Sequence, residues 1–351
     1  MVNIMKQNKI VKILILDFLA IGDLVFITPL LKTLSKNYPD AEIEISIQKQ
    51  LVDILRYNPH IDRIIPFDKK GEHSSLSGYL SYIKELRAVN AALTITLQDN
   101  PRLALLAKLS GARRRIGFAR HWSRKLFYTD PVYPNDKQHR VNYYLDIARA
   151  LPEVKEIYDE GLEMYVNERE KEGIKDFLAK LGVESNDRVI GLNIGGNWPT
   201  KRWPREKFAQ LGDALVQQGY KIIILGGPGD VEDAELIRQK MKEEVLIAAG
   251  KTTLLQLAAL ASELDVVISG DTGPMHMAVA MGTKVVALFG PTETWRYRPY
   301  GDEHQVITLD LNCQPCHDKE CIEREWECMN ELSVDKVLEN VEEMVEEIND
   351  E

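Results

Sequence analysis

Cysteine is missing from most of this chain of 351 residues, because all four cysteines fall between Cys313 and Cys328. Disulfides within the chain therefore cannot link its distant parts. No stretch of about 18 apolar residues occurs, so no segment is expected to cross a bilayer as a helix. Low-complexity segments and short repeats are also missing. The content of 44% apolar and 28% charged residues is typical of a globular protein.

A signal peptide is not expected either. The apolar run Ile13–Leu16 follows several lysines, but Asp17 interrupts it and no small-residue cleavage site is evident. We therefore predict a cytoplasmic protein. The net charge of −10 argues against non-specific binding of nucleic acid by the molecule as a whole.

Acidic residues are absent between Asp99 and Asp130, where eight basic residues occur. Such a segment is usually a solvated face, but it could also bind an anionic acceptor or a phosphate-bearing surface. Five arginines of this segment are the candidates for acceptor binding: Arg113, Arg114, Arg115, Arg120 and Arg124.

Short apolar runs alternate with helical patterns through both halves of the chain. This alternation predicts an α/β protein with parallel sheets and helices on both faces. We expect two Rossmann-like domains, over residues 1–163 and 164–351, with ligands at the carboxyl ends of the strands. The acidic last helix, at about residues 334–348, could pack back on the N-terminal domain. The strands are expected at residues 12–17, 42–47, 63–66, 92–97, 188–194, 221–225, 245–247, 264–268 and 284–289, and the helices at 24–37, 51–57, 77–89, 102–110, 139–151, 205–218, 231–241, 253–262 and 275–281.

The stretch Ser269–His276 gives the strongest signal for a binding site. It follows an apolar run typical of a buried strand, and it leads into a helix. Gly273 frees the turn between the two. Because the free amides at a helix start bind phosphate groups, this corner predicts a nucleotide-diphosphate site. Asp271, Thr272 and His276 would add polar groups to the site, although His276 could equally be a satisfied core residue.

Two further glycine-containing loops each join a strand to a helix. In the loop at residues 195–204, Lys201 and Arg202 could neutralise phosphate. At the loop of residues 225–230, Asp230 or Glu232 could accept hydrogen bonds from ribose hydroxyls, or the acidic residue could simply cap the next helix. Asp23, at the start of the first helix, likewise has two interpretations, a helix cap or a catalytic base.

The four cysteines follow the spacing Cys-x2-Cys-x4-Cys-x6-Cys. Clustered thiols in a cytosolic protein more often hold a metal than form disulfides. Four thiolates, from Cys313, Cys316, Cys321 and Cys328, would suit structural zinc or iron, with no ligand position left open for catalysis. The alternative is four reduced thiols that pack a loop.

These motifs occur together, and in this order, in a family that the chain resembles: the heptosyltransferases of glycosyltransferase family 9, which build the inner core of lipopolysaccharide. The resemblance rests on Lys12–Pro29 with its Gly-Asp pair, on residues 191–204 and 225–230, and on Ser269–Gly290. It covers nearly the whole chain. It implies the B-type glycosyltransferase fold, with two facing Rossmann-like domains and a cleft between them.

The resemblance also implies an activity, the transfer of heptose from ADP-heptose with inversion and without a catalytic metal or other cofactor. The acceptor would be a glycolipid or glycan, and the enzyme could contact the cytoplasmic face of the inner membrane. Asp23 matches the catalytic base of the family, and Lys201 matches its phosphate-contacting lysine. The other positions that match or are candidates for the donor site are Thr200, Asp230, Asp271, Thr272, Gly273 and His276.

Inversion at a sugar carbon requires in-line attack. Asp23 would take the proton of the acceptor hydroxyl, and ADP would leave toward Lys201 and the amides at Thr272 and Gly273. These loops contain no Asp-x-Asp pair to hold a metal. Two alternatives remain: a nucleotide-sugar 2-epimerase of the same fold, and a non-catalytic nucleotide-sugar-binding protein.

Overall fold

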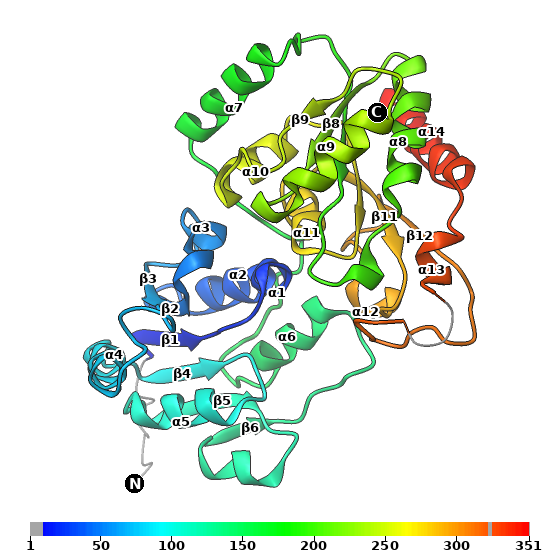
Figure 1. The fold of residues 1–351 in the computed structure, drawn as a ribbon. Coiled ribbons are helices and arrows are strands. Elements are labelled where there is room, and N and C mark those ends of the chain that lie inside the picture. Colours follow the sequence, from blue (N-terminus) through cyan, green and yellow to red (C-terminus); the bar gives the residue numbers. More distant parts are fainter. Residues whose placement is uncertain (1–9, 322–324, 351) are drawn as a thin grey trace, which may run out of the picture. The chain divides into compact units, whose positions relative to one another are not determined.

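The structure, a computed structural model, describes residues 10–321 and 325–350. The chain forms two compact units. One unit comprises the N-terminal part of the chain up to Ala20 together with Phe26–Glu160. The other comprises Ile21–Val25 and the chain from Gly161 onward. Each unit has its own parallel sheet (Figure 1), so the predicted α/β class with two such sheets is confirmed.

The sheet of the first unit has six parallel strands in the order β3-β2-β1-β4-β5-β6. The central strand β1 is almost completely buried, because helices cover both faces of a sheet of this kind. The connections from β1 to β3 run one way along the sheet and those from β3 to β5 run the other way, which puts their helices on opposite faces. The strands are β1 (Lys12–Leu16), β2 (Glu42–Gln48), β3 (Arg63–Phe67), β4 (Leu93–Thr96), β5 (Arg114–Phe118) and β6 (Asp130–Val132).

The helix expected over residues 24–37 is in fact two helices, because Ile27 separates them and Pro29 lies in the first turn of the second. Proline is well tolerated there, since the first turn needs no amide donor. Strands β5 and β6 were not expected, because arginines and an aspartate occupy their first positions. The helices are α1 (Ile21–Phe26), α2 (Thr28–Asn37), α3 (Val52–Leu55), α4 (Leu76–Ala88), α5 (Pro101–Leu109) and α6 (Arg140–Arg149), with short 3-10 turns η1 (Lys49–Leu51) and η2 (Trp122–Leu126).

The sheet of the second unit also has six parallel strands, in the order β12-β11-β10-β7-β8-β9. The chain goes from β7 toward β9 on one side and from β10 toward β12 on the other. The order therefore reverses between β7 and β10, and in open α/β sheets ligands bind at such a point. The strands are β7 (Val189–Asn193), β8 (Lys221–Leu225), β9 (Leu246–Ile247), β10 (Val266–Gly270), β11 (Lys284–Phe289) and β12 (Gln305–Thr308).

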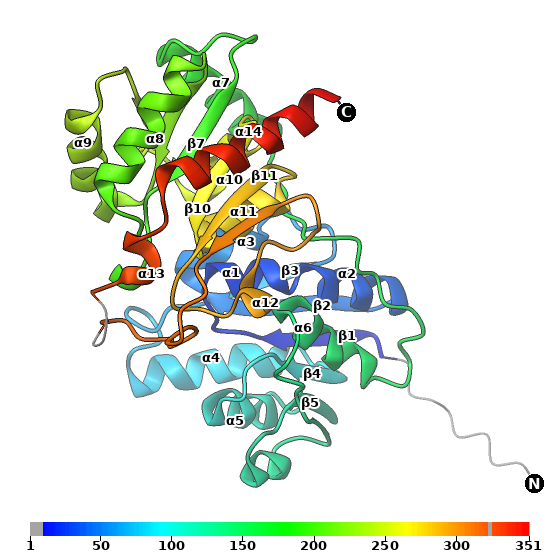
Figure 2. The ribbon, with the colours of Figure 1, turned by 90° about the vertical axis from the view of Figure 1, so that its right-hand side faces the viewer.

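The helices of the second unit form two groups. Helix α8 contacts α9 and α14, whereas α10 contacts α7 and α11. Figure 2 shows α14, in red, beside α8. The elements are α7 (Glu168–Lys180), α8 (Arg205–Gln217), α9 (Val231–Lys240), α10 (Leu254–Ala261), α11 (Gly273–Ala280), α12 (Thr294–Tyr297), α13 (Glu327–Asn330) and α14 (Val334–Asp350), with 3-10 turns η3 (Pro199–Lys201) and η4 (Pro228–Asp230).

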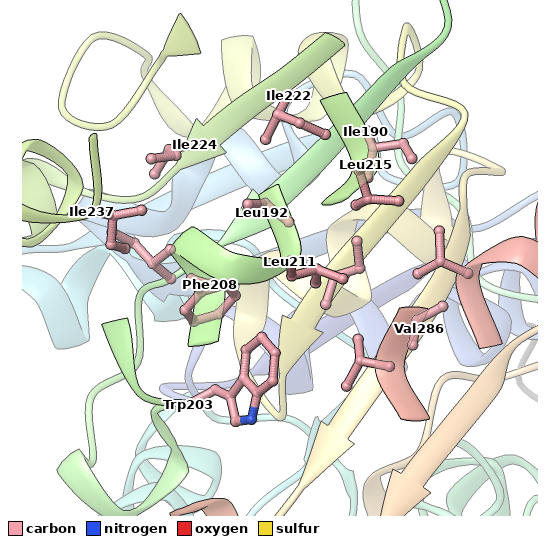
Figure 3. Packing of buried hydrophobic residues seen from close by; sticks show 14 of the residues in the cluster. Ile190, Leu192, Trp203, Phe208, Leu211, Leu215, Ile222, Ile224, Ile237 and Val286 are labelled. Atoms are coloured by element: carbon pink, nitrogen blue, oxygen red, sulfur yellow. The ribbon is translucent and has the colours of Figure 1, made fainter. Parts of the chain in front are cut away.

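One core cluster joins β7, β8, β10 and β11 to α8 and α14 (Figure 3). Trp203 and Phe208 pack edge to face in it, with ring centroids 5.0 Å apart. The Trp203 indole also donates a hydrogen bond to the carbonyl of Leu332, 3.1 Å away. Helix α14 buries Val337 and Val341 in the same cluster. The last helix is thus a component of the second unit's core, and the loop that contains Trp203 is anchored next to it.

Candidate active site

The neighbouring strands β7 and β10 end side by side, and polar side chains link their ends. The side-chain amide of Asn193, the last residue of β7, donates to Ser269 Oγ at 2.7 Å and to Thr272 Oγ1 at 2.9 Å. Thr272 has extended backbone geometry and is the N-cap of α11. The amides at the start of this eight-residue helix are therefore held at the point where the strand order reverses, which suits a phosphate group.

Asp271 is the centre of the cluster at this corner. One of its carboxylate oxygens, Oδ2, lies 2.6 Å from the ammonium group of Lys201 and accepts a hydrogen bond from Thr292 Oγ1 at 2.7 Å. The other, Oδ1, lies 3.8 Å from His276 Nε2. Burial alone would raise the pKa of Asp271, but the nearby His276 imidazole and the charge of Lys201 outweigh it and lower the pKa to about 2. Asp271 is therefore ionised at neutral pH.

Lys201 lies at the end of η3, in the loop after β7. Its ammonium group is 4.7 Å from the centroid of the Trp198 ring, a cation–π distance. The side chain is mostly buried between this ring and Asp271. Lys201 is thus a preorganised cation beside the amides of α11, and an anionic ligand placed there would share it with Asp271.

Asp230 is engaged with its own loop and with the loop after β7. Its Oδ2 accepts a hydrogen bond from the backbone N–H of Gly227 at 2.9 Å, and its Oδ1 lies 3.0 Å from Arg202 Nη2. A Cβ atom added to Gly195 would lie 2.7 Å from Asp230 Oδ2, so only glycine allows this approach. Asp230 occupies the N-cap position of α9, but its side chain makes no capping hydrogen bond to that helix and instead bonds the start of η4. Its contact with ribose stays a prediction. The sequence did not predict that Arg202 pairs with Asp230 or that Asn193 bonds Ser269 and Thr272.

Thr200 and His276, two other predicted donor-site residues, are both buried. The Thr200 hydroxyl donates to the carbonyl of Asp318 at 2.8 Å. His276 lies one turn into α11 beside Asp271. Asp23 is in the first turn of α1, within the segment Ile21–Val25 that belongs to the second unit. The predicted donor-site residues and Asp23 therefore belong to the same compact unit.

Asp17, the residue that follows β1, is completely buried. Its Oδ1 accepts a hydrogen bond from the backbone N–H of Leu19 at 2.8 Å. The carboxylate thus holds the loop that leads to α1.

The predicted acceptor arginines are mostly paired within the first unit. Arg124 Nε lies 3.1 Å from Asp99 Oδ1, and Arg114 Nη1 lies 2.5 Å from Glu153 Oε1. The Arg115 guanidinium donates hydrogen bonds to main-chain carbonyls. The other two are Arg120, which pairs with Asp136, and Arg113, which is exposed.

The structure does not support the predicted metal. Among residues 10–321 and 325–350, no group of three or more His, Cys, Asp and Glu side chains has an arrangement that could hold a metal ion. Burial raises the pKa of Cys328 to about 11, and the charges of Cys316, Cys321 and Cys313 add to the effect. The Cys328 thiol is therefore protonated at neutral pH and packs beside Gly290, at the end of β11. The four cysteines come near one another, but not as a ligand set.

The described part of the chain contains no helix that is both long and apolar enough to span a membrane.

A family model, glycosyltransferase family 9 (heptosyltransferase), matches residues 79–327. The chain belongs to this family. Lipopolysaccharide heptosyltransferase 3 of Escherichia coli K12 is 31% identical to it over 290 residues, which cover 80% of this chain and 82% of that protein.

Solved structures agree with the family assignment. A glycosyltransferase family 9 protein from Veillonella parvula is 30% identical, with a TM-score of 0.88 over 96% of this chain and 97% of that one. Escherichia coli ADP-heptose lipopolysaccharide heptosyltransferase II is 23% identical, with a TM-score of 0.78 over 96% of this chain and 99% of that one. The predicted B-type glycosyltransferase fold is thus confirmed, and the protein is an enzyme, a family 9 glycosyltransferase.

Proposed function

We propose that this family 9 enzyme transfers heptose from ADP-heptose to an acceptor of the lipopolysaccharide core, with inversion and without a catalytic metal. The observation that carries the proposal is the joining of Lys201 and Asp271 beside the first amides of α11. This is a site for the diphosphate of a nucleotide sugar. The names of the relatives support heptose as the sugar, since several are lipopolysaccharide or lipooligosaccharide heptosyltransferases.

The donor site would act mainly on the leaving group. As the bond between the sugar carbon and the diphosphate oxygen breaks, negative charge grows on that oxygen. Lys201 and the amides at Thr272 and Gly273 stabilise this charge without reorganising, because Asn193 and Asp271 already hold them in place. ADP then leaves with the electron pair of the broken bond.

Asp23 would act on the acceptor. Its carboxylate takes the proton of the acceptor hydroxyl while the hydroxyl oxygen bonds to the sugar carbon, opposite to the departing ADP. The acceptor oxygen gives its proton to Asp23 and its electron pair to the new bond with the sugar carbon, while ADP takes the electron pair of the broken bond. An epimerase would need no acceptor, so dependence on an acceptor separates the two reactions.

The test is an ADP-release assay with ADP-heptose and a deacylated Kdo-lipid acceptor. Release of ADP that requires the acceptor would support heptosyl transfer. Binding of ADP-heptose without release would keep the nucleotide-sugar site and reject this acceptor. Isomerised donor without acceptor would favour the 2-epimerase, and no binding of ADP-heptose would contradict the proposed donor.

The basic segment is the proposed site for phosphate groups on the acceptor. We expect the double variant Arg113→Ala/Arg120→Ala to raise the acceptor KM about tenfold, the size of one lost charge-assisted hydrogen bond. The donor KM should not change. Steady-state kinetics with each substrate varied in turn measures both constants, and Lys180→Ala, an exposed lysine of α7, is the control. An unchanged acceptor KM would reject the assignment.

The same unit offers a surface for peripheral contact with the cytoplasmic face of the inner membrane. Around η2, the side chains of Trp122, Leu126 and Tyr133 are 68%, 66% and 60% exposed. Lys125 lies over the Tyr133 ring, with its ammonium group 5.1 Å from the centroid. Exposed aromatic residues beside lysine suit an interface with anionic lipid.

Co-sedimentation with vesicles tests this contact. The protein should bind vesicles that contain anionic phosphatidylglycerol more than purely zwitterionic vesicles, because of its basic residues. The variant Trp122→Ser/Leu126→Ser should lose most of this binding. Leu76→Ser, which changes an exposed leucine of α4, should not. Equal binding by the wild type and the double variant would contradict the proposal.

A further inference from the structure

The segment Gln314–Lys319, which carries one of the four cysteines, is tied to the loop after β11. The side-chain amide of Gln314 donates to the carbonyl of Gly290 at 2.7 Å, and the backbone N–H of His317 donates to the carbonyl of Pro291 at 2.9 Å. His317 has a φ of 59°, in the left-handed region that few non-glycine residues adopt. Such a conformation persists only where the surroundings hold it, and in binding sites it often belongs to the function.

The imidazole of His317 continues this link toward the donor site. Its Nε2 lies 2.5 Å from Oε2 of Glu293, whose side chain is mostly buried. The neighbouring residue Thr292 donates its hydroxyl to Asp271. Asp271 in turn holds Lys201. A continuous series of contacts therefore runs from His317 to the cation of the donor site.

The same segment also holds the loop after β7. Thr200, which is buried, donates its hydroxyl to the carbonyl of Asp318 at 2.8 Å. The ammonium group of Lys319 lies 5.5 Å from the centroid of the Trp198 ring, the ring that Lys201 also approaches. The segment thus contacts both loops that bear the donor-site side chains, and all these residues lie in the second unit.

We propose that Gln314–Lys319 is a positioning segment of the donor site and that His317 is its principal positioning residue. By holding Glu293, His317 keeps the loop at Thr292 in the place where Asp271 and Lys201 are aligned for the diphosphate. A site that is ordered before the ligand arrives does not lose affinity to the cost of ordering it. This inference rests on the proposed donor site, and it gives the segment between the cysteines a role that needs no metal.

Titration calorimetry of the full-length protein with ADP tests the inference. His317→Ala should weaken ADP binding about five- to tenfold, because one charge-assisted contact and the order that it imposes are lost. In steady-state assays the donor KM should rise by a similar factor while kcat stays within about twofold. His317→Gln, which keeps an N–H donor, should restore part of the affinity. Glu293→Gln should weaken ADP binding in the same direction and serves as a second variant if His317→Ala does not fold.

The controls separate this inference from the proposed function. Glu320→Ala, at an exposed position just beyond the segment, should leave ADP binding unchanged. If Lys201→Met weakens ADP binding and neither His317→Ala nor Glu293→Gln does, the positioning role is overturned and the donor site stands. If Lys201→Met leaves ADP binding unchanged, the donor site itself is overturned. A purely structural role would lower the unfolding temperature of His317→Ala with no change in the ADP dissociation constant, and that result would also overturn the inference.

Discussion

The variant Asp23→Asn is expected to lower kcat by about 10²- to 10⁴-fold, the usual contribution of a general base. Asparagine has nearly the same shape as aspartate but cannot take a proton at neutral pH. ADP-heptose should still bind, because the donor contacts come from the loops after β7 and β10. ADP release at saturating donor and acceptor measures kcat, and calorimetry with ADP measures binding.

A control is needed because Asp23 could act only as a charge at the start of α1. Asp53→Asn removes an acidic residue from the first turn of another short helix, α3, and should leave kcat unchanged. Loss of a helix-end charge alone costs about 0.3–1 kcal/mol of stability. If Asp23→Asn lowers the free energy of unfolding by such an amount and leaves kcat within a few-fold, Asp23 acts only as a helix-end charge and the base must be sought elsewhere.

The variant Lys201→Met should have the second-largest effect, a loss of ADP affinity of about 10- to 100-fold. This corresponds to a hydrogen bond between charged groups worth about 1.5–3 kcal/mol. Methionine keeps the length and much of the apolar surface of lysine but removes the cation that faces the diphosphate. Calorimetry with ADP gives the affinity, and Lys251→Met, at an exposed lysine of the same unit, is the control.

Stability should change as well, because Lys201→Met leaves the buried carboxylate of Asp271 without its cation. We expect a loss of about 1–3 kcal/mol in the free energy of unfolding. Adding Asp271→Asn should recover much of this stability but not the affinity for ADP. Denaturant-induced unfolding at pH 7 measures the free energy of unfolding of both variants. The lowered pKa of Asp271, about 2 against 3.8, means that its stabilisation is complete above the higher value and is lost as the pH falls through about 2. Recovery of ADP binding in the double variant would contradict the role of Lys201.

Local sequence patterns were enough for most elements of the fold. The segments Val266–Gly270 and Val189–Asn193 begin with β-branched apolar residues, and a glycine follows within three residues of each end. Each therefore predicts a buried strand with a loop at its carboxyl end. They failed for β5, whose first two residues, Arg114 and Arg115, hide the strand pattern. The strand tolerates these charges because Glu153 neutralises Arg114 and because the guanidinium of Arg115 donates hydrogen bonds to main-chain carbonyls.

The site could be located from sequence only in part. The turn at Asp271–Gly273 and Lys201 were identifiable, because glycine, a helix start and a cation have local signatures. The partners that orient them were not, since Thr292 and His317 come from loops distant in the chain and carry no motif. The metal site was predicted wrongly for a similar reason, because the spacing of cysteines along the chain does not determine how their side chains are oriented.

By itself, then, the sequence determined the alternation of strands and helices and the family, and it predicted a phosphate-binding turn at Asp271–Gly273 with Lys201 as its cation. These are properties of short segments, set by side-chain period, backbone freedom and local charge. Only the tertiary structure decided that Asn193 links the ends of β7 and β10, that Asp230 binds Arg202, and that Gln314–Lys319 contacts the loops after β7 and β11. Those contacts join residues far apart in the chain, and their energies depend on burial and distance, which no local pattern contains.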